Sequence, residues 1–371
     1  MIAPKLQLVD LKKEFSDGSV AAVDGIDLTV AGGETVALLG PSGCGKSTTL
    51  NMIVGLEAPS SGDILIDGKS VIDIAAGTRD VGLVFQDYAV FTSMSVRENL
   101  AFGLKVRGVK KPAIVRAVGE VAELLGLIGM LDASARDLGG SELQRVAIGR
   151  TLVTRPSILL LDEPLSNLEA AARLAMRKEL RRLQKEIGLT IIYVTHDQIE
   201  ALSLADRIAV MNAGKIKQVE KASLICQQPD NLFVAGFMGS PPMNLLRGKL
   251  VRNGAGLAFA KDGFSFDLPS GTTPGEGHER LPAVLGVRPE DIRLASTGEG
   301  LMAARVVLVE PRGSDAVLTV ESGPQTMKVI VPSLGRPEEG AEVGLSIDPS
   351  SLVLFSGESD RRLPLFAEDV S

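Results

Sequence analysis

The segment Gly40–Thr48 constrains this chain more than any other feature of its sequence. Its residues are Gly40, Pro41, Ser42, Gly43, Cys44, Gly45, Lys46, Ser47 and Thr48, which fit the pattern G-x-x-x-x-G-K-[ST]. The apolar run 35–39 precedes the segment and the run 49–54 follows it, so a strand, a glycine-rich turn and a helix start are predicted in that order. A chance glycine-rich turn is the alternative, and such regular flanks argue against it.

The residue types in this loop point to a bound nucleoside triphosphate. Gly40, Gly43 and Gly45 carry no Cβ, so the backbone can come close to an anion and present its N–H groups at the start of the helix. Lys46 is expected to reach the β- and γ-phosphates, and the Ser47 hydroxyl is expected to ligate Mg²⁺. The sequence therefore predicts binding of a nucleoside triphosphate together with Mg²⁺.

Size and composition exclude several classes of protein. With 371 residues the chain can form two or three domains, and a net charge of −7 argues against a broad nucleic-acid surface. The two cysteines, Cys44 and Cys226, cannot make a disulfide framework, and Cys44 inside the phosphate loop favours a reducing compartment. Since no apolar stretch reaches 18 residues, we expect that the chain does not cross a membrane, although it could bind something that does.

The pattern of apolar residues divides the chain into two kinds of structure. Residues 157–161 and 190–194 are short apolar runs typical of a parallel sheet that is covered on both faces, and a helical pattern at 170–188 lies between them. Beyond Gly239, short alternating segments are separated by glycine and proline; they include 305–309, 316–320 and 327–331. We predict an α/β P-loop NTPase domain over residues 1–238 and an all-β domain, a small barrel, over 239–371.

Two acids end the first of these apolar runs. Asp162 at the end of the strand can hold Mg²⁺ through its water shell, and Glu163 can polarise an attacking water. Adjacent acids at a solvated strand end are the alternative. The phosphate loop in the same chain favours a catalytic pair.

A glutamine and a histidine also follow predicted strands. Gln86 comes directly after the run 81–85 and could sense Mg²⁺ or the attacking water, or could be a plain surface residue. His196 follows the run 190–194, where an imidazole could bond a γ-phosphate. A hydrogen-bonded surface histidine is its alternative, but ligands of such sheets bind at the carboxyl ends of the strands. The predicted catalytic set is Glu163, His196 and Gln86, with Ser47, Gln86 and Asp162 around the metal.

Taken together, these segments resemble the ATPase subunits of ABC transporters. The stretches that carry the resemblance are Gly40–Thr48, Gln86, Leu138–Glu142, Ile158–Glu163, Ser166–Glu169 and His196. More narrowly, the chain is similar to the ATPase subunits of maltose-type carbohydrate importers, which add a C-terminal β domain. The stretches similar to that subgroup are Val194–Gln198, Phe233–Pro241 and Gly286–Glu290. The implied fold is an ABC ATPase domain followed by an OB-like, TOBE-type domain for regulation and dimerisation.

The resemblance also implies partners and further binding residues. Two copies of the chain would face each other head to tail, with each ATP clamped between the phosphate loop of one and Gly139, Gly140 and Ser141 of the other. Phe15 matches the aromatic residue that stacks on adenine, and an ordinary core residue is its alternative. The segment from Gln86 to Asn99 would receive a helix from one of two membrane permease subunits, and a solute-binding protein would act indirectly. The implied location is peripheral, on the cytoplasmic face of the inner (plasma) membrane.

The chain departs from the family pattern in the segment that would clamp ATP. The usual signature is Leu-Ser-Gly-Gly-Gln, whereas this chain has Leu138, Gly139, Gly140, Ser141 and Glu142. A carboxylate therefore replaces an amide in an element aimed at a triphosphate. Position 169, where aspartate is expected, also carries a glutamate. Neutral drift on a tolerant surface is one explanation, and our hypothesis is that closure around ATP is weakened and hydrolysis is slow.

The function expected from the resemblance is ATP hydrolysis that powers import of a sugar or sugar derivative. The same machine could import glycerol phosphate, a polyamine or ferric iron, since the cargo is chosen by other subunits. A soluble ABC ATPase that acts on ribosomes or DNA is disfavoured by the single nucleotide domain and the acidic balance. An ATP-sensing regulatory subunit that hydrolyses weakly is the third alternative, because the signature is altered.

Overall fold

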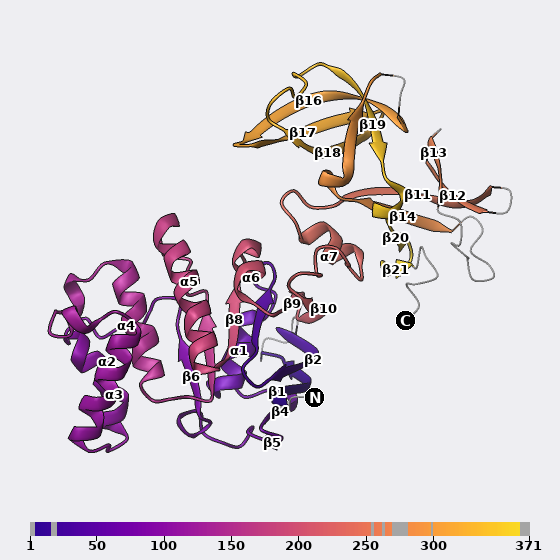
Figure 1. Cartoon of the computed structure of the whole chain (residues 1–371). Coiled ribbons are helices and arrows are strands. Elements are labelled where there is room, and N and C mark those ends of the chain that lie inside the picture. The colour runs from indigo at the N-terminus through magenta and orange to yellow at the C-terminus, as the bar shows by residue number, and fades with distance from the viewer. Residues whose placement is uncertain are drawn as a thin grey trace. The chain divides into compact units, whose positions relative to one another are not determined.

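The computed structural model describes residues 4–15, 21–253, 256–261, 264–268, 281–297 and 300–363. The chain forms two compact units, Met1–Leu224 and Ile225–Ser371 (Figure 1). The change in sequence pattern at residue 239 lies inside the second unit, because helix α7 (Leu232–Phe237) packs with that unit. Leu232 and Ala235 of α7 share an apolar cluster with Met243, Val284 and Phe355. Among the described residues, no helix is both long and apolar enough to span a bilayer.

A six-stranded sheet forms the centre of the first unit. Its strands are β3 (Thr35–Leu39), β6 (Val81–Val84), β7 (Ile158–Asp162), β8 (Thr190–Thr195), β9 (Arg207–Asn212) and β10 (Lys215–Lys221). Their order is β10-β9-β3-β8-β7-β6, and every neighbouring pair is parallel except β9 with β10. Every residue of β3 and β8 is buried, as the continuous apolar runs predicted. The carboxyl ends of β3, β6, β7 and β8 consequently meet at one edge.

A four-stranded antiparallel sheet accompanies the central one. It contains β1 (Pro4–Lys13), β2 (Val23–Ala31), β4 (Ser61–Ile66) and β5 (Lys69–Ser70), in the order β2-β1-β4-β5. Buried residues alternate along β2, as expected of strands with one face toward a core. Leu8 of β1 and Leu38 of β3 share one buried cluster with Leu50 and Ile53 of helix α1 (Lys46–Val54). Helix α1 therefore belongs to the core between these sheets.

Within its described residues, the first unit has five further helices: α2 (Val96–Val106), α3 (Lys111–Leu124), α4 (Gly140–Leu152), α5 (Ala170–Ile187) and α6 (Gln198–Leu204). Helices α2, α3 and α4 gather to one side of the central sheet (Figure 1). The ends of the helices follow local chemistry. Ser95 and Glu98 form a capping box at the start of α2, Pro112 lies in the first turn of α3, and Gly188 ends α5 with a φ of 64°. Three short 3₁₀ turns, Ala76–Thr78, Ile128–Met130 and Ala135–Asp137, lie between these elements.

The second unit is built from antiparallel strands, as the all-β prediction required. One sheet has the order β13-β12-β11-β14-β20-β21 and the other has the order β15-β19-β16-β17-β18. The first sheet contains β11 (Asn244–Asn253), β12 (Gly256–Lys261), β13 (Phe264–Asp267), β14 (Pro282–Val287), β20 (Val353–Ser356) and β21 (Arg362–Leu363). The second contains β15 (Ile292–Ala295), β16 (Met302–Arg312), β17 (Asp315–Ser322), β18 (Gln325–Pro332) and β19 (Glu342–Ile347).

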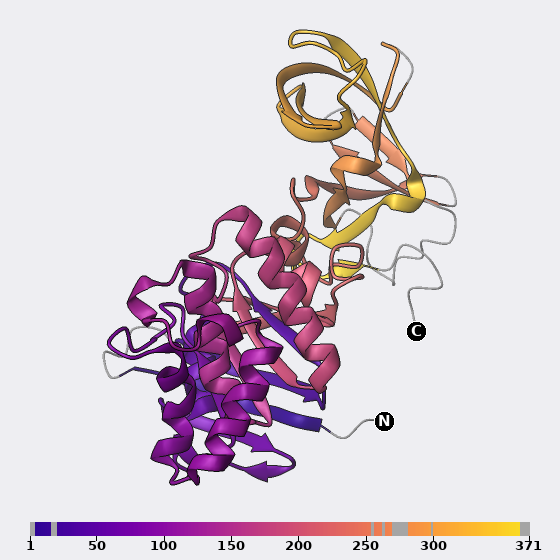
Figure 2. The same ribbon diagram turned by 60° about the vertical axis from the view of Figure 1, so that its left-hand side comes forward.

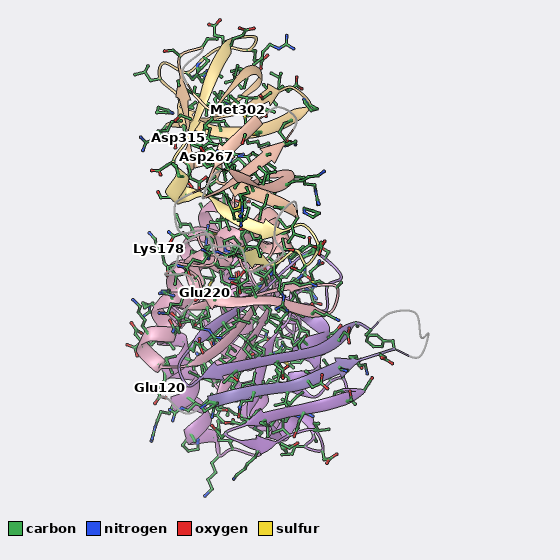
Figure 3. All side chains as sticks on the ribbon, turned by 90° about the vertical axis from the view of Figure 1, so that its right-hand side faces the viewer. Glu120, Lys178, Glu220, Asp267, Met302 and Asp315 are labelled. Carbon is green, nitrogen blue, oxygen red and sulfur yellow. The ribbon has the colours of Figure 1, made fainter. Side chains whose placement is uncertain are left out.

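Both sheets of the second unit contribute to a single core. Phe259 and Leu285 from the first sheet, and Leu318 and Leu345 from the second, are all completely buried in one cluster. The strands curve around this core (Figure 2). Met302, which is labelled in Figure 3, is the first residue of β16 in the second sheet. Two 3₁₀ turns, Pro289–Asp291 and Pro349–Ser351, precede β15 and β20.

Candidate nucleotide-binding and hydrolysis site

The loop between β3 and α1 has the predicted strand–turn–helix context, and two of its glycines are sterically required. Gly45 precedes the first residue of α1 with a φ of 104°, and a Cβ there would lie 2.3 Å from the carbonyl oxygen of Ala22. A Cβ on Gly40 would lie 2.3 Å from the carbonyl oxygen of Met211. Any side chain at either position would force the backbone apart. The loop can therefore keep this shape only with glycine at both ends.

The side chain of Lys46 is directed back into the loop. Lys46 is 6% exposed, and its Nζ donates hydrogen bonds to the carbonyl oxygens of Gly40 at 2.8 Å and Pro41 at 2.9 Å. The ammonium is thus held where phosphate oxygens would enter a cradle of backbone N–H groups. Burial raises the pKa of the nearby Cys44 thiol, and the Lys46 charge only partly offsets that effect. Cys44 is therefore a neutral packing residue rather than a nucleophile.

Ser47 and Asp162 bring two oxygen ligands together. The Ser47 hydroxyl donates to Asp162 Oδ1 at 3.1 Å, which joins the first turn of α1 to the end of β7. Burial raises the pKa of Asp162, while the hydrogen bond from Ser47 lowers it and the neighbouring charge of Glu163 raises it. A divalent cation beside this carboxylate would favour its charged form. Mg²⁺ is usually bound through one or two carboxylates together with substrate phosphates and water, so this pair fits the ion.

Two polar side chains from neighbouring strand ends meet at the Glu163 carboxylate. Gln86, after β6, donates through Nε2 to Glu163 Oε2 at 3.3 Å, and His196, after β8, lies with its Nδ1 3.0 Å from Glu163 Oε1. Glu163 itself has a φ of 44°, and its N–H bonds the carbonyl oxygen of Val194 in β8 at 3.0 Å. This backbone conformation is sparsely populated for residues other than glycine and is found at functional sites. The predicted catalytic set is therefore one cluster.

Exposure and contacts bear on the surface or core alternatives for His196, Gln86 and Phe15. The side chain of His196 is 56% exposed and that of Glu163 is 19% exposed, so solvent and ligands can reach the pair. Gln86 is exposed, but its amide bonds Glu163 rather than only solvent. The alternative that Phe15 is a core residue is wrong, because the residue is 44% exposed. Lys13 Nζ lies 5.0 Å from the centre of that ring, and stacking on adenine stays a prediction.

The altered signature segment forms the start of helix α4. Gly139 is the capping residue, and its N–H donates to Glu142 Oε2 at 2.9 Å. The Glu142 carboxylate thus satisfies one of the open N–H groups at the helix start, where the helix dipole also favours a negative charge. Glu169 likewise caps α5, but it makes no side-chain capping bond there. From the sequence alone, the Glu142 carboxylate was expected only to repel the triphosphate. The spacing Gly-x-x-Glu, close to the capping-box pattern, was the available signal.

Two residues that hold the segment after Gln86 were not singled out from the sequence. Asn99 is completely buried in α2, and its amide bonds both the N–H and the carbonyl oxygen of Phe91 at 2.9 Å. Arg150 of α4 donates to the carbonyl oxygen of Ala89, and its guanidinium lies 4.4 Å from the centre of the Phe91 ring. Polar residues inside mostly apolar helices were the signal that could have identified both. They tie this segment to α2 and α4.

Comparison with known protein families covers most of the chain. The family described as "ABC transporter" matches residues 23–166, "MalK OB fold domain" matches 239–292, and "TOBE domain" matches 285–355. The last two matches meet within the second unit, which the sequence predicted to be OB-like and TOBE-type. The combination of an ABC ATPase domain with OB-fold and TOBE domains is confirmed by these matches.

Three known proteins show the extent of the similarity. The sulfoquinovosyl glycerol transport ATP-binding protein SmoE of Agrobacterium fabrum is 41% identical over 96% of this chain and 99% of that protein. The trehalose/maltose import ATP-binding protein MalK of Thermococcus litoralis is 43% identical over 94% of this chain and 97% of that protein. The solved structure of cbiO1 from Clostridium perfringens, part of the ABC transporter complex cbiONQ, has a TM-score of 0.55 and 32% identity over 60% of this chain and 90% of its own.

Proposed function

The chain belongs to the ATP-binding subunits of ABC importers, and from this premise we propose that it hydrolyses ATP with Mg²⁺ to drive uptake of a polyhydroxylated solute. The solute would be a sugar, a sugar derivative or glycerol phosphate. One observation carries the hydrolytic part of the proposal: Gln86, Glu163 and His196 converge at the carboxyl edge of the sheet, beside the phosphate loop that begins at Gly40.

Each residue of the cluster has a role that follows from its chemistry. The N–H groups of the loop and the Lys46 ammonium would hold the phosphates, and Ser47 and Asp162 would hold the metal ion. Mg²⁺, when bound, would neutralise charge that develops on the phosphate oxygens. The Glu163 carboxylate would orient the attacking water, because a carboxylate accepts a hydrogen bond from it.

His196 and Gln86 would fix the geometry around Glu163. His196 contacts Glu163 through Nδ1, and in the imidazolium form its Nε2 would carry a second N–H that could donate to a γ-phosphate oxygen. Gln86 donates to the other carboxylate oxygen, and Asn167 Nδ2 in turn donates to the Gln86 carbonyl oxygen at 3.0 Å. A shift of the segment after Gln86 would therefore disturb the carboxylate. This contact offers a route by which a membrane partner could control hydrolysis.

We further propose that two copies of the chain work together on two permease subunits, at the cytoplasmic face of the plasma membrane. The names of the relatives, transport and import ATP-binding proteins, support an assembly that includes a membrane component. A nucleotide-sandwich dimer would complete each site with Gly139–Ser141 of the second copy. A solute-binding protein would present the cargo to the permease and would not need to touch this chain.

The relatives narrow the class of cargo. Their names include sulfoquinovosyl glycerol, trehalose/maltose and, in Cupriavidus pinatubonensis, sn-glycerol-3-phosphate; this last relative is 41% identical to the chain. All of these solutes carry at least two free hydroxyl groups. Glycerol phosphate is therefore a second candidate cargo, supported by the name of this last relative.

The test is uptake into proteoliposomes that contain the complete transporter and its binding protein. Radiolabelled maltose, trehalose and sn-glycerol 3-phosphate would be supplied separately, with ATP inside the vesicles. We expect ATP-dependent uptake of one class of solute with the native subunit. We expect at least about a hundredfold slower uptake with Glu163→Gln, since a positioned base contributes about 10²–10⁴-fold. Equal uptake by the two forms would contradict the proposed role of Glu163.

A further inference from the structure

Close to His196 in the chain lies a buried carboxylate, that of Glu200 in the first turn of α6. Glu200 is 3% exposed, and its Oε2 accepts hydrogen bonds from the hydroxyl of Tyr193 and, at 2.9 Å, from the hydroxyl of Thr195. Both donors lie on β8, immediately before His196. Because a buried charge is costly unless it is paired and hydrogen-bonded, this carboxylate is held by a defined set of partners.

Arg173 of α5 supplies the compensating charge. Its Nε lies 3.7 Å from Glu200 Oε1, and its Nη1 lies 3.9 Å from Asp197 Oδ2. The Nε forms no hydrogen bond within the described structure, so its attraction to Glu200 is electrostatic at this distance. Its Nη2 donates to the carbonyl oxygen of Leu168 at 3.2 Å. Arg173 therefore links α6 to the segment that follows Glu163.

The backbone on both sides of His196 is fixed by the same partners. The Thr195 hydroxyl donates to Glu200 and accepts a hydrogen bond from the Asp197 N–H at 2.9 Å. The Asp197 carboxylate then caps α6 by accepting from the N–H groups of Ile199 at 2.8 Å and Glu200 at 3.2 Å. The residue before His196 and the residue after it are thus joined through one hydroxyl. The orientation of the imidazole follows from this anchored turn.

We infer that Glu200 is a positioning residue for His196, and that Arg173 couples the His196 turn to the segment that carries Glu163. The inference rests on the proposed function, because it assigns how the imidazole is kept 3.0 Å from the Glu163 carboxylate. Neither Glu200 nor Arg173 is assigned a contact with the nucleotide. Misplacement of a reacting group by about 1 Å can cost about a hundredfold in rate, so loss of the anchor should appear in turnover.

The kinetic test uses the full chain in its transporter and compares variants of similar shape. We expect Glu200→Gln to lower kcat for ATP hydrolysis by about tenfold or more, with KM for ATP changed by less than about threefold, because nucleotide binding does not use this carboxylate. Arg173→Met should have the same signature, and Arg173→Lys should restore part of the rate. The control is Glu186→Gln, which removes an exposed acid on α5 that pairs with Arg182. Its kcat should stay within about twofold of the native value.

A spectroscopic readout tests the positioning role without hydrolysis. The chain has two histidines, His196 and His278, and His278 lies outside the described residues. In a His278→Gln background, the imidazole ¹⁵N signals come from His196 alone. We expect Glu200→Gln to shift or broaden these signals in nucleotide-free protein, and Glu186→Gln to leave them in place.

The outcomes separate the inference from the proposed function. If Glu200→Gln fails to fold, Thr195→Val removes the bridging hydroxyl and Thr195→Ser retains it, so only the valine variant should lose turnover and change the spectrum. Unchanged kcat together with unchanged ring signals in Glu200→Gln, or in Thr195→Val, would overturn the inference. A native chain that hydrolyses no ATP would overturn the proposed function, while the ¹⁵N spectra would still decide the positioning role.

Discussion

Restoring the usual signature should accelerate ATP hydrolysis. The perturbation is the triple change Gly139→Ser, Ser141→Gly and Glu142→Gln at the start of α4. In the proposed dimer this helix start faces the triphosphate of the second copy, and the Glu142 carboxylate adds a negative charge there. The structure shows that Glu142 Oε2 accepts the Gly139 N–H at 2.9 Å. A glutamine side-chain oxygen could accept the same bond without the charge.

The expected size of the effect follows from Coulomb's law. Like charges about 4 Å apart repel by about 1 kcal/mol in water and by about 4 kcal/mol near a protein surface. Relief of even the smaller value corresponds to about a fivefold change in rate. The effects on folding are modest: loss of the charge at the helix start costs about 0.3–1 kcal/mol, and a glycine at position 141 costs about 0.5–1 kcal/mol. A serine cap at position 139 should restore roughly 0.3 kcal/mol of folding free energy.

The assay is steady-state ATP hydrolysis by the assembled transporter at saturating ATP. We expect at least about a fivefold rise in kcat for the triple variant, and most of that rise for Glu142→Gln alone. The rise should shrink with added salt, since ions screen charges that solvent reaches. Glu186→Gln is the matched control, because it removes an exposed acid of α5 that pairs with Arg182. Rates for native and restored forms that agree within twofold would refute the repulsion.

Three further outcomes are expected. Lys46→Ala should weaken ATP binding by about 10–100-fold in a fluorescent-nucleotide titration, since a hydrogen bond to a charged group contributes about 1.5–3 kcal/mol, and unaltered affinity would exclude a phosphate contact. Phe259→Ala should destabilise the second unit by about 3–5 kcal/mol in urea unfolding, because that ring is completely buried, and should leave ATP affinity unchanged. Burial raises the pKa of the Cys44 thiol above its ordinary value, so the folded state keeps its proton at a pH where the unfolded state has lost it. The free energy of unfolding should therefore fall as pH rises from about 8 to about 10, and should fall less in Cys44→Ala.

Much of the site could be predicted because strand ends in a parallel sheet share one edge. Gln86, Glu163 and His196 each lie just after an apolar run, and strands β6, β7 and β8 turned out to be neighbours. The specific contacts could not be predicted. Glu163 adopts a φ of 44°, which no periodicity in the sequence reveals, and this conformation accompanies the placement of its carboxylate between Gln86 and His196.

Other features depend on packing between distant segments. The Arg173–Glu200 pair joins two helices whose polar residues look like ordinary surface charges in sequence. Composition changes visibly at Gly239, but α7 belongs to the second unit because its apolar side chains pack there. For Glu142, the family motif indicated an unfavourable charge but not the capping bond that its side chain makes with Gly139. The local sequence pattern therefore predicted the helices and strands, whereas the roles of these side chains depend on tertiary contacts.

The most direct test of the account is a single-turnover measurement with γ-labelled ATP and Mg²⁺ on the native transporter and on its Glu163→Gln form. The account predicts that both forms bind ATP with the same affinity. It predicts that the native form releases labelled phosphate and that the variant retains intact ATP. Release of phosphate at the same rate by both forms, or failure of the native form to bind ATP at all, would contradict it.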